Sequence, residues 1–161
     1  AVRDGGTITG GNASQLSDGA AAVVLMDGTL ASQRNLEPLG VYRGMAVAGC
    51  EPDEMGIGPV FAIPKLLKRN GLTIDDIGLW ELNEAFAAQV LACTRKMGVA
   101  DDDPRINPNG GAIAIGHPLG VTGARILNSA AIELHKQNKR YALVTMCIGV
   151  GQGYAVILER A

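Results

Sequence analysis

Three side chains in this sequence combine reactive chemistry with suggestive surroundings: Asn83, His117 and Cys147. A histidine has an unperturbed pKa of ~6.5 and can take a proton from a thiol or return one. A cysteine beside a glycine-rich turn such as 149–153 has free backbone N–H groups nearby, which lower a thiol pKa and can hold an oxyanion. An asparagine can fix a water or donate to a carbonyl. These groups suit acyl transfer, or proton removal next to a thioester.

Each residue also has a purely structural interpretation, and the sequence leaves both open. Asn83 precedes a helical stretch and could serve as its N-cap. Cys147 follows an apolar strand, where a lone cysteine is usually an inert buried thiol. His117 could be a turn residue bonded to backbone. A site is favoured because all three fall at junctions between expected elements, two of them with glycines alongside.

The elements expected around these residues alternate between strands and helices. Apolar runs predict strands at 20–26, 40–50, 77–82, 141–146 and 154–158. Helical spacing predicts helices at 85–97, at 121–137, and from about residue 62 to Gly71, with Pro64 in the first turn of the last of these. Residues 73–76 resemble a capping sequence for one short turn. This order indicates an α/β fold with a mixed, mostly parallel sheet, whose final strand runs antiparallel to its predecessor.

That architecture predicts where the three side chains meet. In open α/β sheets, ligands bind beyond the carboxyl ends of the strands. Asn83 directly follows the strand expected at 77–82, and Cys147 directly follows the one expected at 141–146. His117 comes just before the helix expected at 121–137. We therefore expect all three at one edge of the sheet.

Composition argues against several other classes of protein. The chain has 161 residues and a net charge of −2, and no run of Lys or Arg suggests nucleic-acid binding. No apolar stretch approaches the ~20 residues that span a bilayer, so no membrane insertion is expected. The three cysteines are far apart and form no metal-ligand spacing with the two histidines, so neither a disulfide framework nor a metal site is expected.

Two glycine-rich segments resemble nucleotide-binding loops only superficially. Residues 149–153 lack the full G-x-G-x-x-G pattern and precede a strand. Residues 116–123 precede a helix but lack the Lys-Ser/Thr pair of a P-loop. Neither segment therefore predicts a nucleotide cofactor.

Four ordered segments resemble the thiolase family. Three match its C-terminal signatures and one the segment before its C-terminal domain: Asn83-Glu-Ala-Phe-Ala87, Asn109-Gly-Gly-Ala-Ile-Ala-Ile-Gly-His-Pro118, Cys147-Ile-Gly149 and Gly11-Asn-Ala-Ser-Gln-Leu-Ser-Asp-Gly-Ala20. Asn83-Glu84 stands where ketoacyl synthases and sterol-carrier-type thiolases carry a histidine, which indicates the degradative or acetoacetyl-CoA type. The resemblance implies a thiolase-like C-terminal domain at 38–161, with a five-stranded sheet and helices on its faces. Residues 1–37 would be the tail end of an N-terminal domain, with a CoA-contacting segment, a last strand and a linker.

The resemblance also implies catalytic roles. His117 would activate the nucleophilic cysteine and, with Asn83 acting through a water, form one oxyanion hole. Cys147 would be the second acid/base, exchanging a proton with the methyl group of acetyl-CoA. The N–H of Gly149 would contribute to the second oxyanion hole. Val150 departs from the glycine common in the family, which matters only if the backbone there needs a positive φ.

Coenzyme A and acyl-CoA are implied as substrates, and no cofactor is expected. Ser14 would hydrogen-bond the pantetheine arm of CoA, and Ala85 and Phe86 would line its channel. The family's nucleophile lies in an N-terminal domain, and a loop domain supplies much of the CoA site. Neither the segment that carries the nucleophile nor the loop domain matches a part of this chain. Cys50 and Cys93 do not lie in the nucleophile's sequence context.

The chain alone is therefore expected to be inactive, as the C-terminal piece of a thiolase that cleaves 3-ketoacyl-CoA or condenses two acetyl-CoA molecules. Two alternatives stay open: a split subunit that needs an N-terminal partner, and a non-catalytic acyl-CoA-binding or interaction module. The resemblance further implies a homodimer or homotetramer. A bacterial cytoplasm is the expected location; because the sequence starts at Ala1 without Met, a mitochondrial or peroxisomal one stays open.

Overall fold

A mixed sheet of four strands forms the centre of the computed structural model, which describes all 161 residues. The strands are β1 (Gly40–Gly49), β2 (Leu79–Leu82), β3 (Tyr141–Ile148) and β4 (Gln152–Arg160), in the order β1-β4-β3-β2. Only β2 and β3 are parallel, whereas β4 is antiparallel to both β3 and β1. The α/β class and the antiparallel last strand are confirmed, but the sheet is not mostly parallel. The three-residue turn between β3 and β4 reverses the chain, and only a long helical connection such as that between β2 and β3 permits parallel pairing.

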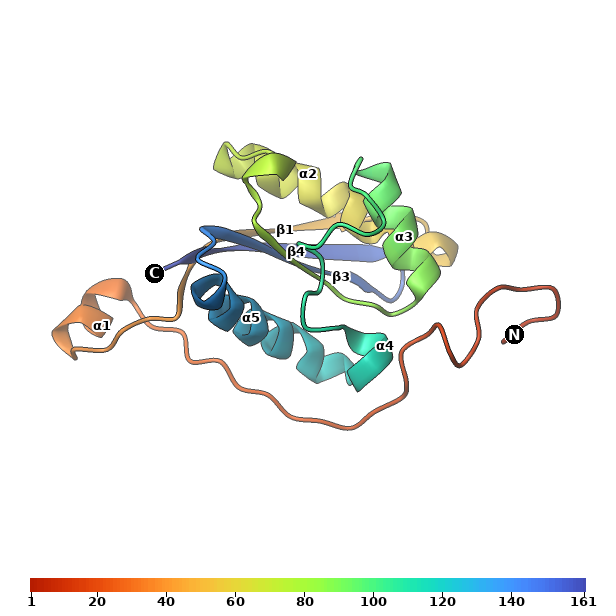
Figure 1. Ribbon diagram of the computed structural model, residues 1–161, viewed down its shortest axis with the longest axis horizontal. Coiled ribbons are helices and arrows are strands. Elements are labelled where there is room, and N and C mark those ends of the chain that lie inside the picture. Colours follow the sequence, from red (N-terminus) through yellow and green to blue (C-terminus); the bar gives the residue numbers. More distant parts are fainter.

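Helices cover both faces of this sheet (Figure 1). One face carries α2 (Gly58–Asn70), with α3 (Ala87–Lys96) beside it, and the other carries α5 (Leu119–Lys136). Side chains alternate along each strand, so Trp80 packs toward α2 while its neighbour Leu79 packs toward α5. None of the helices is both long and apolar enough to cross a membrane.

Helix α2 starts four residues earlier than expected. It begins at Gly58, so Pro59 occupies the first turn and Pro64 lies inside the helix. Burial of Ala62, Ile63 and other apolar residues on its inner face outweighs the hydrogen bond that Pro64 cannot donate. Gly71 ends the helix with φ 66°, as the sequence predicts. The short turn is also confirmed, as the 3₁₀ helix η2 (Ile74–Asp76) with a Thr73 capping box.

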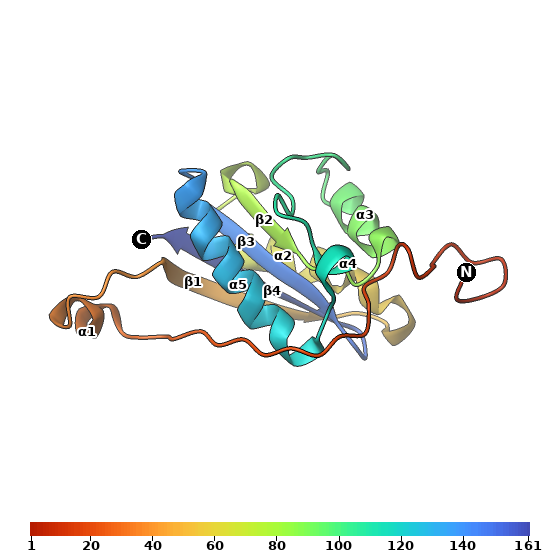
Figure 2. The same cartoon turned by 60° about the horizontal axis from the view of Figure 1, so that its bottom comes forward.

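Residues 1–39 lie outside the sheet and contain one short helix, α1 (Gly28–Gln33). The strand predicted at 20–26 is not formed. A strand needs a neighbour for its backbone hydrogen bonds, and this segment has no pairing partner. Figure 2 shows the segment running alongside α5, where Asn128 donates to the carbonyl of Ala22 at 3.1 Å. Val24 and Leu25 keep 85% and 83% of their surface exposed.

The sheet has four strands rather than the five that the family resemblance implies, and a loop lies along the free edge of β2. Ile106 makes a single bridge to Trp80, and the Trp80 N–H donates to the carbonyl of Arg105 at 2.8 Å. Pro104 has no N–H to donate and Asn107 has φ 45°, so regular pairing cannot extend past this bridge.

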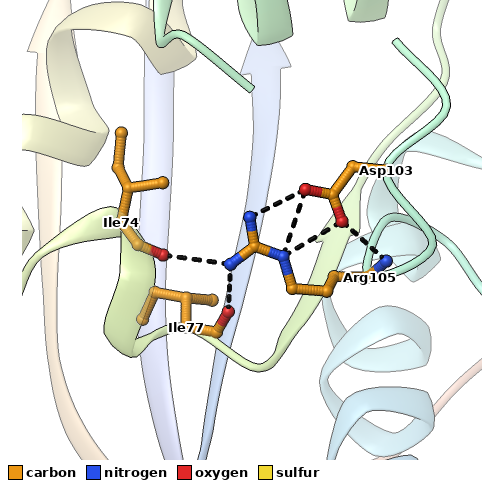
Figure 3. A network of polar contacts seen from close by, with 4 residues as sticks. All are labelled: Ile74, Ile77, Asp103 and Arg105. Carbon is orange, nitrogen blue, oxygen red and sulfur yellow. Dashed lines mark hydrogen bonds and ion pairs between the residues drawn. The ribbon is translucent and has the colours of Figure 1, made fainter. Parts of the chain in front are cut away.

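An arginine network fixes this loop in place (Figure 3). The Arg105 guanidinium pairs with the Asp103 carboxylate at 2.7 Å. It also donates to the carbonyls of Ile77 and Ile74, at 2.9 and 3.3 Å. These bonds tie the loop to the start of β2, and the polar residues Asn83 and Glu84 follow the opposite end of that strand.

Candidate active site

The backbone of Asn83 is fixed at the carboxyl end of β2. Its N–H donates to the carbonyl of Thr145 at 3.0 Å, which continues the parallel ladder to β3. Its side chain is buried, and its Nδ2 lies 3.3 Å from His117 Nε2. The N-cap of α3 is Phe86, and the helix begins at Ala87, two residues later than expected. The capping interpretation of Asn83 is therefore wrong.

His117 is held between the short helix α4 (Ala112–Ile115) and the start of α5. Gly116 precedes it with φ 90°, and the Gly116 carbonyl accepts a hydrogen bond from Arg125 Nη1 at 2.9 Å. Pro118, the N-cap of α5, follows it. The backbone on both sides of the histidine is thus constrained, one side by a side chain of α5 and the other by a proline ring.

The side chain of Thr122 determines which imidazole nitrogen of His117 carries the proton. Its Oγ1 lies 2.6 Å from Nδ1, and its hydroxyl donates to the carbonyl of Pro118 at 3.1 Å. A hydroxyl has one proton, so Oγ1 accepts from an Nδ1–H. Nε2 then carries a lone pair and accepts from the Asn83 amide. The Nε2 lone pair therefore sits at the carboxyl edge of the sheet, where a base is needed.

The surroundings of His117 keep it neutral. Burial lowers its pKa from the usual value near 6.5, and the positive charge of Arg125 lowers it further. At pH 7 the imidazole is therefore a base, consistent with the lone pair on Nε2.

Cys147 lies at the same edge of the sheet, but within β3 rather than after it. The strand extends to Ile148, two residues beyond the predicted end. The parallel pairing of β2 with β3 ends at Leu82 and Thr145. Asn83 and Cys147 both lie just beyond that pair, although Cys147 still pairs with Gly153 of β4. Burial raises the pKa of the Cys147 thiol, which therefore rests protonated at neutral pH. Such a thiol can give up a proton as an acid and take it back as a thiolate.

The turn from 149 to 151 joins β3 to β4. Gly149 is exposed and has open space around it. Val150 has φ 66°, so the departure from glycine noted in the sequence falls at a position that needs a positive φ. This conformation strains a β-branched residue. Gly151 also has a positive φ, and a Cβ there would lie 2.2 Å from the carbonyl oxygen of Cys50.

The residues expected to contact CoA also come together. The Ser14 N–H donates to the carbonyl of Ala85 at 3.0 Å, and Ala13 forms an isolated bridge with Phe86. The N-terminal segment thus crosses the start of α3 and continues to the carbonyl of Gln15, which lies 3.4 Å from the His117 N–H. One extended segment therefore links the expected CoA-binding residues to the histidine.

Two further residues, Thr122 and Glu84, belong to this site, and neither was assigned a role there from the sequence. Thr122 is fully buried against His117. Glu84 accepts from Asn107 Nδ2 at 3.0 Å and from the Ile113 N–H at 3.2 Å, which ties the glycine-rich segment to the end of β2. A Cβ at Gly111 would lie 2.2 Å from the Glu84 carboxyl carbon. A hydroxyl in the first turn after His-Pro was an available signal for Thr122, whereas the partners of Glu84 depend on tertiary structure.

No cluster of three or more His, Cys, Asp or Glu side chains converges as in a metal site. The arrangement is instead that of an acid–base site: a neutral histidine with an oriented lone pair, an amide donor against it and a protonated thiol at the same edge. Such sites serve acyl transfer and carbon-acid chemistry.

Comparison with known proteins identifies the family. Residues 36–160 match the family model of the thiolase C-terminal domain, and residues 1–29 match that of the thiolase N-terminal domain. The chain belongs to the thiolase family.

Curated relatives and solved structures agree with this assignment. The chain is 56% identical over 158 residues to a 3-oxoadipyl-CoA/3-oxo-5,6-dehydrosuberyl-CoA thiolase of Escherichia coli, covering 98% of this chain and 39% of that protein. It is 53% identical to a 3-ketoacyl-CoA thiolase of Bacillus subtilis, with 96% and 39% covered. The structure superimposes on human mitochondrial 3-ketoacyl-CoA thiolase with a TM-score of 0.92 at 46% identity, covering 96% and 39%. The acetyl-CoA acetyltransferase of Bacillus anthracis gives 0.95 at 42%, covering 99% and 40%. The chain thus spans about two fifths of the length of these relatives.

Proposed function

We propose that this chain is the C-terminal portion of a thiolase that transfers acyl groups between CoA thioesters. The observation that carries the proposal is the hydrogen-bonded series Thr122–His117–Asn83, at the same sheet edge as Cys147, in a chain of this family. That series supplies an oriented base and an amide donor, the two groups that thioester chemistry requires beside a nucleophile.

In the proposed reaction, His117 Nε2 removes the proton from a nucleophilic cysteine thiol outside these 161 residues. The thiolate attacks the 3-keto carbon of a 3-ketoacyl-CoA, and the N–H of Gly149 helps to stabilise the oxyanion that forms on the 3-keto oxygen. The bond between the second and third acyl carbons breaks, leaving an acyl-enzyme and an acetyl-CoA enolate. Cys147 protonates that enolate, whose thioester oxygen is stabilised by His117 and by Asn83 acting through a water. The thiol of a second CoA then gives its proton to the Cys147 thiolate and attacks the acyl-enzyme. The shortened acyl-CoA is released, and His117 returns its proton to the freed nucleophilic cysteine.

The state of the three cysteines supports an external nucleophile. Burial is the largest cause that raises each thiol pKa, to about 11 for Cys93. Cys93 is fully buried on α3, and Cys50 lies beside Glu54 and Glu51, whose negative charges raise its pKa further. A cysteine nucleophile needs a lowered pKa or an adjacent base. None of the three has a lowered pKa, and none forms a hydrogen bond with the base His117: Cys50 bonds to the carbonyl of Glu54 and Cys93 to that of Gly56.

We also propose the domain division and the partners. Residues 38–161 would form the C-terminal domain, and residues 1–37 the tail of an N-terminal domain that carries Ser14 to the pantetheine arm of CoA. Exposed apolar side chains such as Val24, Leu25 and Tyr42 support coverage by further polypeptide. The active protein would be a homodimer or homotetramer, as the family resemblance implies.

The test compares this chain alone with a chimera. In the chimera, the chain replaces the matching 158-residue segment of the E. coli 3-oxoadipyl-CoA thiolase. Loss of the absorbance of acetoacetyl-CoA or 3-oxoadipyl-CoA on adding CoA measures thiolysis. We expect turnover by the chimera and none by the chain alone. Turnover by the chain alone would overturn the external nucleophile, and a folded but inactive chimera would count against the function itself.

A further inference from the structure

A polar cavity of about 70 Å³ lies behind Asn83, on the α5 side of β2. Its polar lining includes Glu81 and Asn83 from β2 and its end, Asn107 and Asn109 from the following loop, and Arg125 from α5. It has room for at least two water molecules, at about 30 Å³ each. Of the four residues given catalytic roles above, only Asn83 lines this cavity.

Two buried acceptor oxygens in this region have no protein donor. Glu81 and Asn83 are 4% and 3% exposed, and neither Glu81 Oε1 nor Asn83 Oδ1 has a hydrogen-bond partner. The Asn83 Nδ2 is already used on His117, so its Oδ1 must find a donor elsewhere. A buried acceptor without a partner costs about 1–3 kcal/mol, and two in one place call for a shared donor.

The amide donors that line the cavity are already engaged. Asn107 Nδ2 uses both of its N–H groups, on the Leu82 carbonyl and on Glu84, and Asn109 Nδ2 uses one of its two on Glu133. Arg125 uses one nitrogen on the carbonyl of Gly116 and forms no ion pair with Glu81 within 4.0 Å. Water in the cavity is the donor that can satisfy both oxygens together.

We propose that Glu81 is a positioning residue of the site, which holds the Asn83 amide through cavity water so that its Nδ2 faces His117. Arg125 lines the cavity from α5. Its positive charge attracts the Glu81 carboxylate, and its Nη1 donates to the carbonyl of Gly116, one residue before the histidine. Neither Glu81 nor Arg125 would touch substrate. The proposal rests on the proposed function, because it assigns Asn83 and His117 their catalytic parts.

The charge state of Glu81 suits this role. Burial raises its pKa to about 7; Arg125 opposes the rise, and the carboxylates of Glu133 and Glu84 add to it. Near neutral pH the carboxyl group can therefore either donate to a bridging water or accept from it. In both states the water can keep a proton toward Asn83 Oδ1.

Substitutions of Glu81 separate positioning from simple structural support. Glu81→Gln keeps a carbonyl oxygen and adds N–H donors, whereas Glu81→Leu removes the link. Trp80→Phe is the matched control, since Trp80 is fully buried on the same strand but packs against the opposite face of the sheet. We would record the ¹⁵N imidazole signals of His117 in this chain, and kcat and KM for CoA in the chimera.

The expected pattern is specific. Glu81→Leu shifts the His117 signals and lowers kcat roughly 10- to 100-fold with KM for CoA unchanged, because a displaced catalytic amide costs rate rather than binding. Glu81→Gln stays near the parent, and Trp80→Phe lowers stability without moving His117. The proposal is overturned if Glu81→Leu leaves the His117 signals and kcat unchanged, or if Trp80→Phe reproduces its effects. An inactive parent chimera would instead count against the proposed function, and the His117 signals of the chain would still report on Glu81.

Discussion

Replacing Thr122 with valine should change which nitrogen of His117 carries the proton. Valine has nearly the shape of threonine but no hydroxyl, so the change deletes the 2.6 Å contact to Nδ1 and the 3.1 Å hydrogen bond to the carbonyl of Pro118. Thr122 is fully buried, which means that water cannot replace the lost acceptor. An Nδ1–H left without a partner costs about 1–3 kcal/mol.

That cost is large enough to move the tautomer equilibrium. Each 1.36 kcal/mol is a factor of about ten, so a cost of 1–3 kcal/mol should lower the preference for the Nδ1–H form roughly 5- to 150-fold. The Nε2–H form gains, and Nε2 can then no longer accept from Asn83 or take a proton from a thiol. Thiolysis by the chimera should fall by a similar factor, roughly 5- to 150-fold in kcat.

The assay is ¹⁵N NMR of the His117 imidazole, in which protonated and unprotonated nitrogens have well-separated shifts. Wild type should show a protonated Nδ1, and Thr122→Val a shift toward a protonated Nε2. Thr122→Ser is the matched control, because it keeps the hydroxyl and should keep both the tautomer and most of the activity. A Thr122→Val variant with an unchanged tautomer would refute the reasoning.

Three further predictions follow from the described contacts and charges. Because the folded protein raises the Glu81 pKa from 4.5 to about 7, its neutral form stabilises the fold, and that contribution is lost as pH rises between these values. Relative to Glu81→Gln, wild type should lose about 3 kcal/mol of unfolding free energy over this range in urea titrations, and parallel curves would contradict it. Val150→Gly should raise the unfolding free energy by about 1 kcal/mol, because Val150 is 81% exposed and its positive φ is strained; a lower urea midpoint would argue against strain there. A thiol reagent should modify the partly exposed Cys50 first and reach Cys93 and Cys147 only as the protein opens; fast labelling of two or more thiols would show that the site is less closed than described.

The junction residues could be predicted because their positions depend on local pattern. Asn83 and His117 each follow or precede a clear element, and the rule that strand ends gather at one edge brings them within 3.3 Å of each other. Gly71 as a helix end and the antiparallel β4 were predicted in the same way, from a terminating glycine and a short connection. Such features are encoded within a few residues of where they occur.

The features missed depend on partners far away in the sequence. The apolar run 20–26 has the composition of a strand but finds no strand to pair with among these residues. Pro64 lies inside α2 because the buried face of that helix outweighs the proline's local preference. Glu81 resembles an ordinary strand glutamate until the cavity and Arg125 are placed beside it. Sequence pattern predicts elements, whereas contacts between them decide which polar residues serve the site.

On the proposed mechanism, this chain supplies His117 and Cys147 as acid–base groups to a nucleophile located elsewhere. Incubating the chimera with acetyl-CoA labelled in its acetyl group, then mapping the labelled peptide, tests this division of roles. We predict that label appears on a cysteine outside these 161 residues, that Cys147→Ala keeps the label but loses thiolysis, and that His117→Ala loses both. Label on a Cys147 peptide, or labelling that disappears in Cys147→Ala but survives in His117→Ala, would contradict the account.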